Sequence, residues 1–244
     1  ASAVHGDWLP VEPARKKEEA QHAVNFLIDY YMGPDGPDTI LVPVGPLTNI
    51  GMALKKEPRI AKRIPKMVIM GGNHMVGNTT ASSEFNFWVD PESAKITIAA
   101  GIEQVIVPLD ATHRACVSID DCKRWREIGT PGLVAAASFV EKRISGYSIS
   151  QPMENPQSAP VHDALCIAYI IDPTVITKMV HCYVEVDDQP GIDDARLICD
   201  VHGRTTKAKN AYLTEDALLN GYVALDADEP KFVQMLTEAL GRAH

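Results

Sequence analysis

The stretch Lys66-Met67-Val68-Ile69-Met70-Gly71-Gly72 is a short apolar run that two glycines close. A run of this length, bounded by a turn signal, is typical of a strand buried on both faces. Downstream, Asp90-Pro91-Glu92-Ser93 combines an Asp cap with Pro in the first turn and predicts the start of a helix that reaches residue 100. A second apolar run, Gln104-Val105-Ile106-Val107, follows it. Strand, helix and strand in this order predict a parallel βαβ unit.

The same alternation extends in both directions along the chain. Towards the N-terminus, we expect a helix over residues 18–31, a strand over 39–44 and a helix from Gly45-Pro46-Leu47-Thr48-Asn49 through Leu54. Towards the C-terminus, the pattern predicts helices near 118–128, 133–145, 162–171 and 230–240, and strands near 182–186, 196–201 and 222–225. The predicted fold class is α/β, a mainly parallel sheet flanked by helices, with an irregular C-terminal part.

Composition narrows the class of protein. The chain has 244 residues, of which 45% are hydrophobic and 23% charged, which suits one large globular domain or two small ones. The formal net charge of −9 argues against a binder of nucleic-acid phosphates and against a polybasic membrane anchor. No apolar run approaches the length of a membrane span, and the N-terminus lacks the pattern of a signal peptide.

Five cysteines are spread along the chain without a CxxC pair, at positions Cys116, Cys122, Cys166, Cys182 and Cys199. In a chain of this size they indicate reduced thiols of a cytoplasmic protein rather than a disulfide framework. Cys166 and Cys199 lie in apolar runs, so we expect both to pack as small hydrophobic side chains.

Three predicted strand ends carry glycines or polar residues, namely Gly45-Pro46-Leu47-Thr48-Asn49, Met70-Gly71-Gly72 and Leu109-Asp110-Ala111-Thr112-His113. Ligands of parallel α/β sheets bind beyond the carboxyl ends of the strands. Because glycine lets a ligand or a loop approach the backbone closely, these three ends predict the rim of a binding pocket.

The polar loop, residues 73–86, contains Asn78, Glu84 and Asn86. If the chain around Phe85 is extended, Glu84 and Asn86 project from one side and Phe85 turns the other way into the core. Two amides and a carboxylate form a set of donors and acceptors suited to the hydroxyl groups of a sugar. From composition alone, an ordinary loop rich in Asn, Ser and Thr is the favoured interpretation.

A second candidate is Pro160-Val161-His162-Asp163-Ala164-Leu165. An Asp in the first turn of a helix commonly interacts with the helix dipole, which is a sufficient structural explanation of Asp163. His162 beside it can hold a metal ion or donate a proton. Taken by itself, the pair favours the structural interpretation.

Taken together, these segments resemble the inosine–uridine preferring nucleoside hydrolase family, which cleaves the bond between base and ribose. The resemblance rests on six stretches that occur in the family's order: Val4-His5-Gly6; Val44 to Ile50; Met70-Gly71-Gly72 with Gly77-Asn78; Glu84-Phe85-Asn86 with Asp90-Pro91-Glu92; Leu109 to His113; and Val161-His162-Asp163-Ala164. It implies a Rossmann-like nucleoside hydrolase fold and a calcium cofactor.

The resemblance also implies roles for individual residues. It implies a ribose site made of Met70, Asn78, Glu84 and Asn86, with His5 near the substrate. Calcium would bind the backbone carbonyl of Thr48 and the carboxylate of Asp163. His162 would lie by the base and protonate it as it leaves. His before the Asp resembles the non-specific and inosine–uridine preferring members, whereas purine-specific members have Trp at that place.

The chain departs from the family in one respect. The family's aspartate-rich turn, roughly Asp-x-Asp-Pro-Gly-x-Asp-Asp, follows its first strand, and no such stretch precedes His5. We therefore expect a single nucleoside hydrolase domain over residues 1–244 that is incomplete at its N-terminus. A similar stretch, Asp187-Asp188-Gln189-Pro190-Gly191-Ile192-Asp193-Asp194, has Gln at one aspartate position. Of a rearranged metal site and an acidic turn around Pro190-Gly191, the turn is favoured.

Three functions are compatible with these observations. The first is an active hydrolase of inosine- or uridine-type ribonucleosides, forming a homodimer or homotetramer as family members often do. The second is a nucleoside- or ribose-binding protein without catalysis, because part of the family's calcium site is missing. The third, an α/β enzyme for a phosphorylated ligand, is weak because the glycine-rich turns lack dinucleotide or P-loop spacing. Neither nucleic acid nor a membrane is an expected partner, and the preferred base is not predicted.

Overall fold

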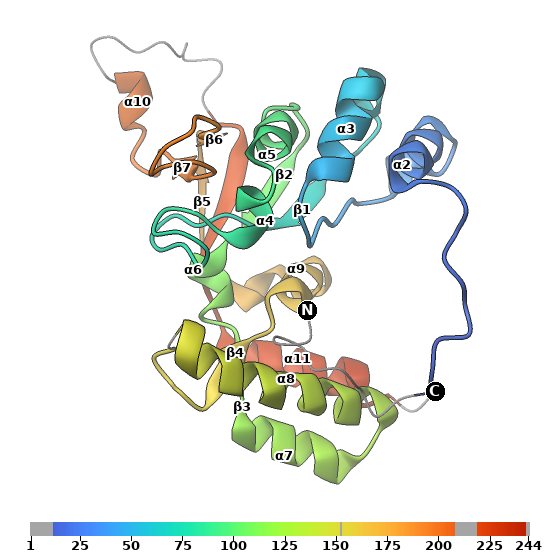
Figure 1. The fold of residues 1–244 in the computed structure, drawn as a ribbon, viewed down its shortest axis with the longest axis vertical. Coiled ribbons are helices and arrows are strands. Elements are labelled where there is room, and N and C mark those ends of the chain that lie inside the picture. The colour runs from blue at the N-terminus through green and yellow to red at the C-terminus, as the bar shows by residue number, and fades with distance from the viewer. Residues whose placement is uncertain (1–11, 152, 208–218, 243–244) are drawn as a thin grey trace. The chain divides into compact units, whose positions relative to one another are not determined.

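The computed structural model describes residues 12–151, 153–207 and 219–242 (Figure 1). These residues fall into two compact units. The sheet unit comprises Glu19–Asp110 and Lys178–Leu225, and the helical unit comprises Ala111–Thr177 with segments from both ends of the chain.

The sheet unit is built on four strands in the order β1-β2-β8-β5. They are β1 (Met67–Met70), β2 (Gln104–Val107), β8 (Gly221–Ala227) and β5 (Ile176–Cys182). β1 and β8 both pair in parallel with β2. The predicted strand over 39–44 is reduced to one parallel bridge between Leu41 and Met67. The predicted α/β class with a mainly parallel sheet is confirmed.

Three helices, α2 (Ala23–Met32), α3 (Thr48–Lys56) and α5 (Pro91–Ile98), lie side by side in the sheet unit (Figure 1). They share one hydrophobic core with alternate residues of the strands, including Met67, Ile69 and Ile106. The strand residues between these, such as Val68 and Val105, are buried as well. Burial of both faces explains why the strands are continuous apolar runs rather than alternating ones.

The remaining elements of the sheet unit are short. They are the 3-10 turns η1 (Gly36–Asp38) and η2 (Pro58–Lys62), the helices α4 (Phe85–Trp88) and α10 (Arg204–Lys207), and the antiparallel strands β6 (Val184–Val186) and β7 (Leu197–Cys199). The short helix α6 (Leu109–Thr112) begins in this unit and ends in the helical unit. The acidic stretch at 187–194 lies in the connection between β6 and β7. The prediction of a turn there is confirmed, since Ala195 N–H donates to the Asp187 carbonyl at 2.8 Å.

The helical unit consists of α7 (Ile119–Ile128), α8 (Pro131–Ser150), α9 (His162–Ile171), η3 (Pro173–Val175) and α11 (Glu229–Leu240), with the antiparallel strands β3 (Cys116–Ser118) and β4 (Ser158–Pro160). Ser118 and Asp121 form a capping box at the start of α7. Trp125 is fully buried, and its indole N–H donates to Thr237 Oγ1 at 2.7 Å, which fixes α7 against α11.

Most predicted elements are present, with some shifts. β2 and α9 match the predicted bounds, whereas the first predicted helix begins only at Ala23, after His22 caps it. α8 runs to Ser150, and β3, β4 and β5 were not predicted. β3 and β4 have only three residues each, too short for a periodic signal. Within the residues that the structure describes, no helix is long and apolar enough to span a membrane.

Close packing of α3 on α5 depends on Gly51. A Cβ on this glycine would lie 2.7 Å from Ser93 Oγ and 2.9 Å from Ser93 Cα. We predict that Gly51→Ala lowers the free energy of unfolding by about 1–3 kcal/mol, the usual cost of overpacking. Urea titration measures this, with Gly191→Ala as control because nothing lies within 4 Å of its Cβ. Equal stability of the two variants would contradict the close packing.

Candidate functional site

Glu84 anchors the polar loop to the end of β1. It is 2% exposed and caps α4. Its Oε2 accepts from Gly72 N–H at 2.9 Å and from Phe87 N–H at 3.4 Å, and its Oε1 accepts from Asn86 N–H at 2.9 Å. Three backbone donors at a helix start offset the cost of burying this carboxylate and hold it in one position.

The expectation of an extended chain around Phe85 is wrong. Phe85 begins α4 and is 50% exposed, whereas Phe87 is fully buried. The helix forms because the Glu84 side chain satisfies two of its first N–H groups, and a helical turn reverses which aromatic ring faces the core. Glu84 and Asn86 are nevertheless brought together, through the hydrogen bond from Asn86 N–H to Glu84 rather than by alternation along a strand.

Asn86 and Met70 are in direct contact. The Asn86 amide nitrogen donates to the Met70 carbonyl at 3.1 Å and approaches the Met70 sulfur at 3.3 Å. Both side chains are nearly buried. The last residue of β1 and the first turn of α4 therefore form one connected group with Glu84.

Asn78 joins this group through the backbone. Its Oδ1 accepts at 2.9 Å from the N–H of Phe85, the residue next to Glu84. The chain folds back tightly before Asn78, because a Cβ on Gly77 would lie 2.5 Å from Ser83 N. Asn78 is partly exposed, unlike Glu84 and Asn86.

Neighbouring segments of the sheet unit fix the polar loop from two sides. The Asp110 carboxylate accepts from His74 N–H at 2.7 Å and Met75 N–H at 3.1 Å. From the β6–β7 connection, Asp193 accepts from Ser82 Oγ at 3.2 Å, and the Asp194 carbonyl accepts from Ser83 Oγ. Since Leu109 N–H also donates to Gly72, the ends of β1 and β2 lie at one edge, as predicted.

Thr48 begins α3 and contacts Asp90. Its hydroxyl donates to Asp90 Oδ2 at 2.6 Å, while Asp90 Oδ1 accepts from Ser93 N–H at 2.9 Å. Burial acts to raise the pKa of Asp90, but the hydrogen bonds from Thr48 and Ser93 outweigh it, so the pKa of Asp90 lies below its usual value. The sequence indicated Asp90 only as a helix cap, and no local signal pointed to its contact with Thr48.

His162 lies in the helical unit with a partner on each ring nitrogen. Nδ1 is 2.7 Å from Thr112 Oγ1, and Nε2 is 2.7 Å from the Tyr147 hydroxyl. Arg143 donates to the same hydroxyl at 2.9 Å and lies over the Tyr147 ring. Part of His162 is accessible to solvent, but protein atoms surround the ring closely. This burial, with the charges of Arg143 and His113, lowers the pKa of His162 well below its usual value.

The other predicted site residues are less defined. Asp163 lies in the first turn of α9 and is exposed, and His5 lies outside the described residues. In residues 12–151, 153–207 and 219–242, no three His, Cys, Asp or Glu side chains are grouped as a metal site. Met70, Asn78, Glu84 and Asn86 are thus brought together in the sheet unit, Thr48 contacts Asp90 there, and His162 and Asp163 belong to the helical unit.

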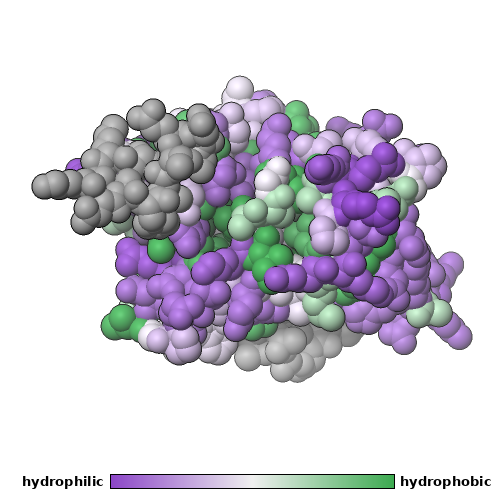
Figure 2. Space-filling view, turned by 90° about the horizontal axis from the view of Figure 1, so that it is seen from above, coloured by the Kyte–Doolittle hydropathy of each residue, from purple (hydrophilic) through white to green (hydrophobic). Residues whose placement is uncertain are grey.

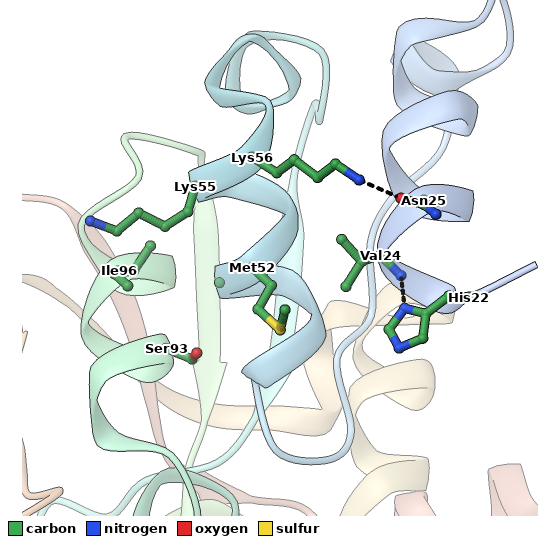
Figure 3. A pocket seen from close by; sticks show the side chains of 9 residues that line it. His22, Val24, Asn25, Met52, Lys55, Lys56, Ser93 and Ile96 are labelled. Carbon is green, nitrogen blue, oxygen red and sulfur yellow. Dashed lines mark hydrogen bonds between the residues drawn. The ribbon is translucent and has the colours of Figure 1, made fainter.

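A cleft of about 580 Å³ between α2, α3 and α5 contains none of the predicted site residues (Figure 3). Its lining includes Val24, Met52 and Ile96, and Lys56 at its edge donates to Asn25 at 2.7 Å. Figure 2 shows hydrophobic residues in the middle of one face of the molecule, with hydrophilic residues around them. The residues predicted to bind a sugar are in the loop after β1, not in this cleft.

Comparison with known proteins identifies the family. The model of the inosine–uridine preferring nucleoside hydrolases matches residues 2–234. The chain belongs to this family. It is 39% identical over 216 residues to the pyrimidine-specific ribonucleoside hydrolase RihB of Escherichia coli O157:H7, covering 86% of this chain and 67% of the relative. The predicted enzyme class, a hydrolase of ribonucleosides, is confirmed.

Solved structures of nucleoside hydrolases have the same fold. The purine-preferring ribonucleoside hydrolase from Gardnerella vaginalis superposes with a TM-score of 0.84 at 29% identity, covering 98% of this chain and 73% of that one. The plant nucleoside hydrolase PpNRh1 superposes with a TM-score of 0.85 at 21% identity, covering 100% and 75%. The nucleoside hydrolase fold is therefore shown by structure as well as by sequence.

Sequence reasoning did not find the partners of His162 in this nucleoside hydrolase chain. Thr112, Arg143 and Tyr147 come from α6 and α8, far from His162 along the chain. The Leu109 to His113 stretch was noticed as a strand end, but nothing local connected Thr112 to His162. Arg143 and Tyr147 are one helical turn apart in a helix without another distinguishing feature.

The lowered pKa of His162 predicts a pH-dependent stability. The unfolded chain binds a proton near pH 6.5 that the folded His162 does not, so the free energy of unfolding falls as pH drops below about 6.5. The His162→Gln variant lacks this titrating group, so its free energy of unfolding should change less between pH 7 and 5 than that of the unaltered chain. The two slopes should differ by up to about 1.4 kcal/mol per pH unit. Urea titrations at pH 7, 6 and 5 measure it.

The control for this experiment is His202→Gln, which alters an exposed imidazole in a turn. Its pH dependence should follow that of the unaltered chain. If His162→Gln has the same pH dependence as the unaltered chain, His162 takes up its proton normally in the fold and the interpretation fails.

Proposed function

We propose that this nucleoside hydrolase binds ribose through Glu84, Asn86 and Asn78, with Met70 beside them. The observation that carries the proposal is the connected group at the end of β1, in which a buried carboxylate and a buried amide are held by backbone hydrogen bonds. The group lies after a parallel strand, where ligands of such sheets bind. Carboxylate and amide oxygens accept from sugar hydroxyls, and amide nitrogens donate to them.

The geometry suits the charge that develops in the reaction. Cleavage of a bond between C1′ of ribose and a base nitrogen builds positive charge on the sugar, as in glycoside hydrolysis. Glu84 is held in advance by three backbone N–H groups, so it need not reorganise as that charge grows. Contacts that tighten on the flattened sugar lower the barrier more than they tighten substrate binding.

His162 is proposed to act on the leaving base, but the form of that action differs from the sequence-based hypothesis. A proton donor works best when its pKa lies near the working pH, and the pKa of His162 lies well below that. A neutral imidazole does not store a proton for the base. We therefore assign to it a hydrogen bond from one ring nitrogen to the base, which replaces the contact of that nitrogen with Thr112 or Tyr147 when substrate binds.

Nucleoside hydrolases are in general metal-dependent, and calcium as the metal here is part of the proposal. The Thr48 carbonyl and the Asp163 carboxylate are oxygen donors of the kind that calcium prefers, but calcium takes about 6–8 oxygens. The described residues do not supply such a set. When bound, calcium would hold and acidify the attacking water.

The sequence-based alternative, a nucleoside- or ribose-binding protein without catalysis, stays a prediction. The homodimer or homotetramer stays a prediction from the family resemblance, and the cytoplasmic location stays a prediction from the pattern of cysteines. Two of the relatives named above differ in base, one pyrimidine-specific and one purine-preferring, so both classes of nucleoside belong in the assay.

The ribose assignment predicts how a variant responds to missing hydroxyls. Asn86→Ala should lower kcat/KM for uridine and inosine about 10–100-fold, which corresponds to the loss of one or two hydrogen bonds. On the 2′-, 3′- or 5′-deoxynucleoside that lacks the partner hydroxyl, the loss should nearly vanish. Steady-state hydrolysis of the four substrates of each base measures it.

Ser82→Ala is the matched control, because it disturbs the same loop through Asp193 and should weaken all substrates equally. An equal loss across every deoxynucleoside for Asn86→Ala would remove Asn86 from the ribose site. Ribose binding by the unaltered chain without release of base would favour the non-catalytic alternative.

The calcium assignment is tested by binding rather than by activity. Isothermal titration should show that the Asp163→Ala variant binds calcium at least about tenfold more weakly than the unaltered chain does, since a carboxylate ligand is lost. Asp120→Ala, which removes an exposed carboxylate paired with Lys123 on α7, is the control and should not change the affinity. Unchanged affinity of the Asp163 variant would exclude Asp163 as a ligand.

A further inference from the structure

Arg143 lies one helical turn before Tyr147 on α8, in the helical unit. Its Nη2 donates to the Tyr147 hydroxyl oxygen at 2.9 Å, and its guanidinium carbon lies 4.8 Å from the centroid of the Tyr147 ring. Tyr147 is nearly buried, so water screens the interaction between this cation and the hydroxyl only in part.

The Arg143 guanidinium fixes the role of the Tyr147 oxygen. A guanidinium has five N–H groups and no acceptor, so the oxygen accepts from it. A hydroxyl oxygen that accepts from a cation is polarised, which makes its own O–H a stronger donor and the oxygen a weaker acceptor of a second hydrogen bond. His162 Nε2 lies 2.7 Å from this hydroxyl. The charges therefore favour a hydrogen bond from the Tyr147 O–H to Nε2.

The direction of this hydrogen bond determines where the proton of His162 lies. The ring is neutral near pH 7, since burial lowers its pKa well below the usual value. A neutral imidazole has one N–H and one nitrogen with a lone pair. When Nε2 accepts from Tyr147, the proton is on Nδ1, which donates to Thr112 Oγ1 at 2.7 Å. The fully buried Thr112 hydroxyl can accept from Nδ1–H because it has two lone pairs.

We propose that Arg143 is a positioning residue, which acts through the Tyr147 hydroxyl to hold the proton of His162 on Nδ1. The other tautomer would direct an Nε2–H at an oxygen that already accepts from a cation. In the favoured tautomer, hydrogen bonds run in one direction, from the guanidinium to the Thr112 oxygen.

The tautomer decides which ring nitrogen contacts the base. Within the proposed function, on which this step rests, His162 donates a hydrogen bond to the leaving base. With the proton on Nδ1, this nitrogen exchanges Thr112 for the base, while Nε2 stays with Tyr147. Arg143 thereby orients the ring for the base without touching the base and without a transfer of the proton.

Nuclear magnetic resonance tests the tautomer on the whole chain, with histidine rings labelled with nitrogen-15. Two-bond proton–nitrogen correlation spectra at pH 8, without substrate, distinguish Nδ1–H from Nε2–H because protonated and unprotonated ring nitrogens resonate far apart. The signals of His162 are those that the His162→Gln variant lacks. We expect the Nδ1–H tautomer in the unaltered chain. Nε2–H as its main form would overturn the proposal.

A variant of Arg143 tests what holds the proton there. Arg143→Met keeps an extended side chain but removes the donors and the charge. The ratio of Nδ1–H to Nε2–H in His162 should fall about fivefold, the change expected from the loss of one hydrogen bond. Lys142→Met is the matched control, because it removes an exposed cation from the neighbouring position of α8 and should not alter the ratio. An unchanged ratio in Arg143→Met, or an equal fall in both variants, would overturn the proposal.

Tyr147→Phe gives an independent result if Arg143→Met does not fold, since it removes the hydroxyl and leaves Arg143 in place. The ratio should fall in this variant as well, and an unchanged ratio would contradict a role for the hydroxyl. The spectra need neither ribose binding nor cleavage of nucleosides. A chain that does neither still reports the tautomer of His162, so the two proposals fail separately.

Discussion

A carboxylate placed at the buried end of a strand must be surrounded by donors, because burying its charge without them costs several kcal/mol. Glu84 meets this requirement with the N–H groups of Gly72, Asn86 and Phe87. These contacts join the segment that follows β1 to the first turn of α4. The position of Asn86 against Met70, and hence the whole candidate ribose site, follows from this one arrangement.

The same arrangement around Glu84 requires glycine at both positions after β1. A Cβ on Gly71 would lie 2.6 Å from the Phe87 ring. Gly72 has a positive φ of 72°, a backbone conformation that residues with a side chain rarely adopt. Both positions must be glycine for Phe87 to fill the core while Glu84 reaches the Gly72 N–H. The same close approach brings Leu197 of β7 against Gly72, so the β6–β7 pair lies against the start of the polar loop.

The helical unit shows a different way of preparing a functional group. His162 is held by hydroxyls from two other elements, and burial with two nearby cationic or ionisable side chains keeps its ring neutral. A neutral ring has one N–H donor and one acceptor, so its hydrogen-bond direction depends on the Thr112 and Tyr147 hydroxyls. These surroundings support the proposal that His162 contacts the base by a hydrogen bond rather than by stored positive charge.

The chain by itself determined the α/β class, β2, α9, the Asp90 cap and the family, because these depend on local periodicity, capping and short motifs. It also indicated that Glu84 and Asn86 lie together, although the expected extended backbone around Phe85 was wrong. The tertiary structure decided that Phe87 rather than Phe85 is buried, that Thr48 contacts Asp90, and that Tyr147 and Thr112 hold His162. Each of these depends on atoms brought together by folding from separate elements, and no local pattern encodes which distant side chain will satisfy a buried polar group.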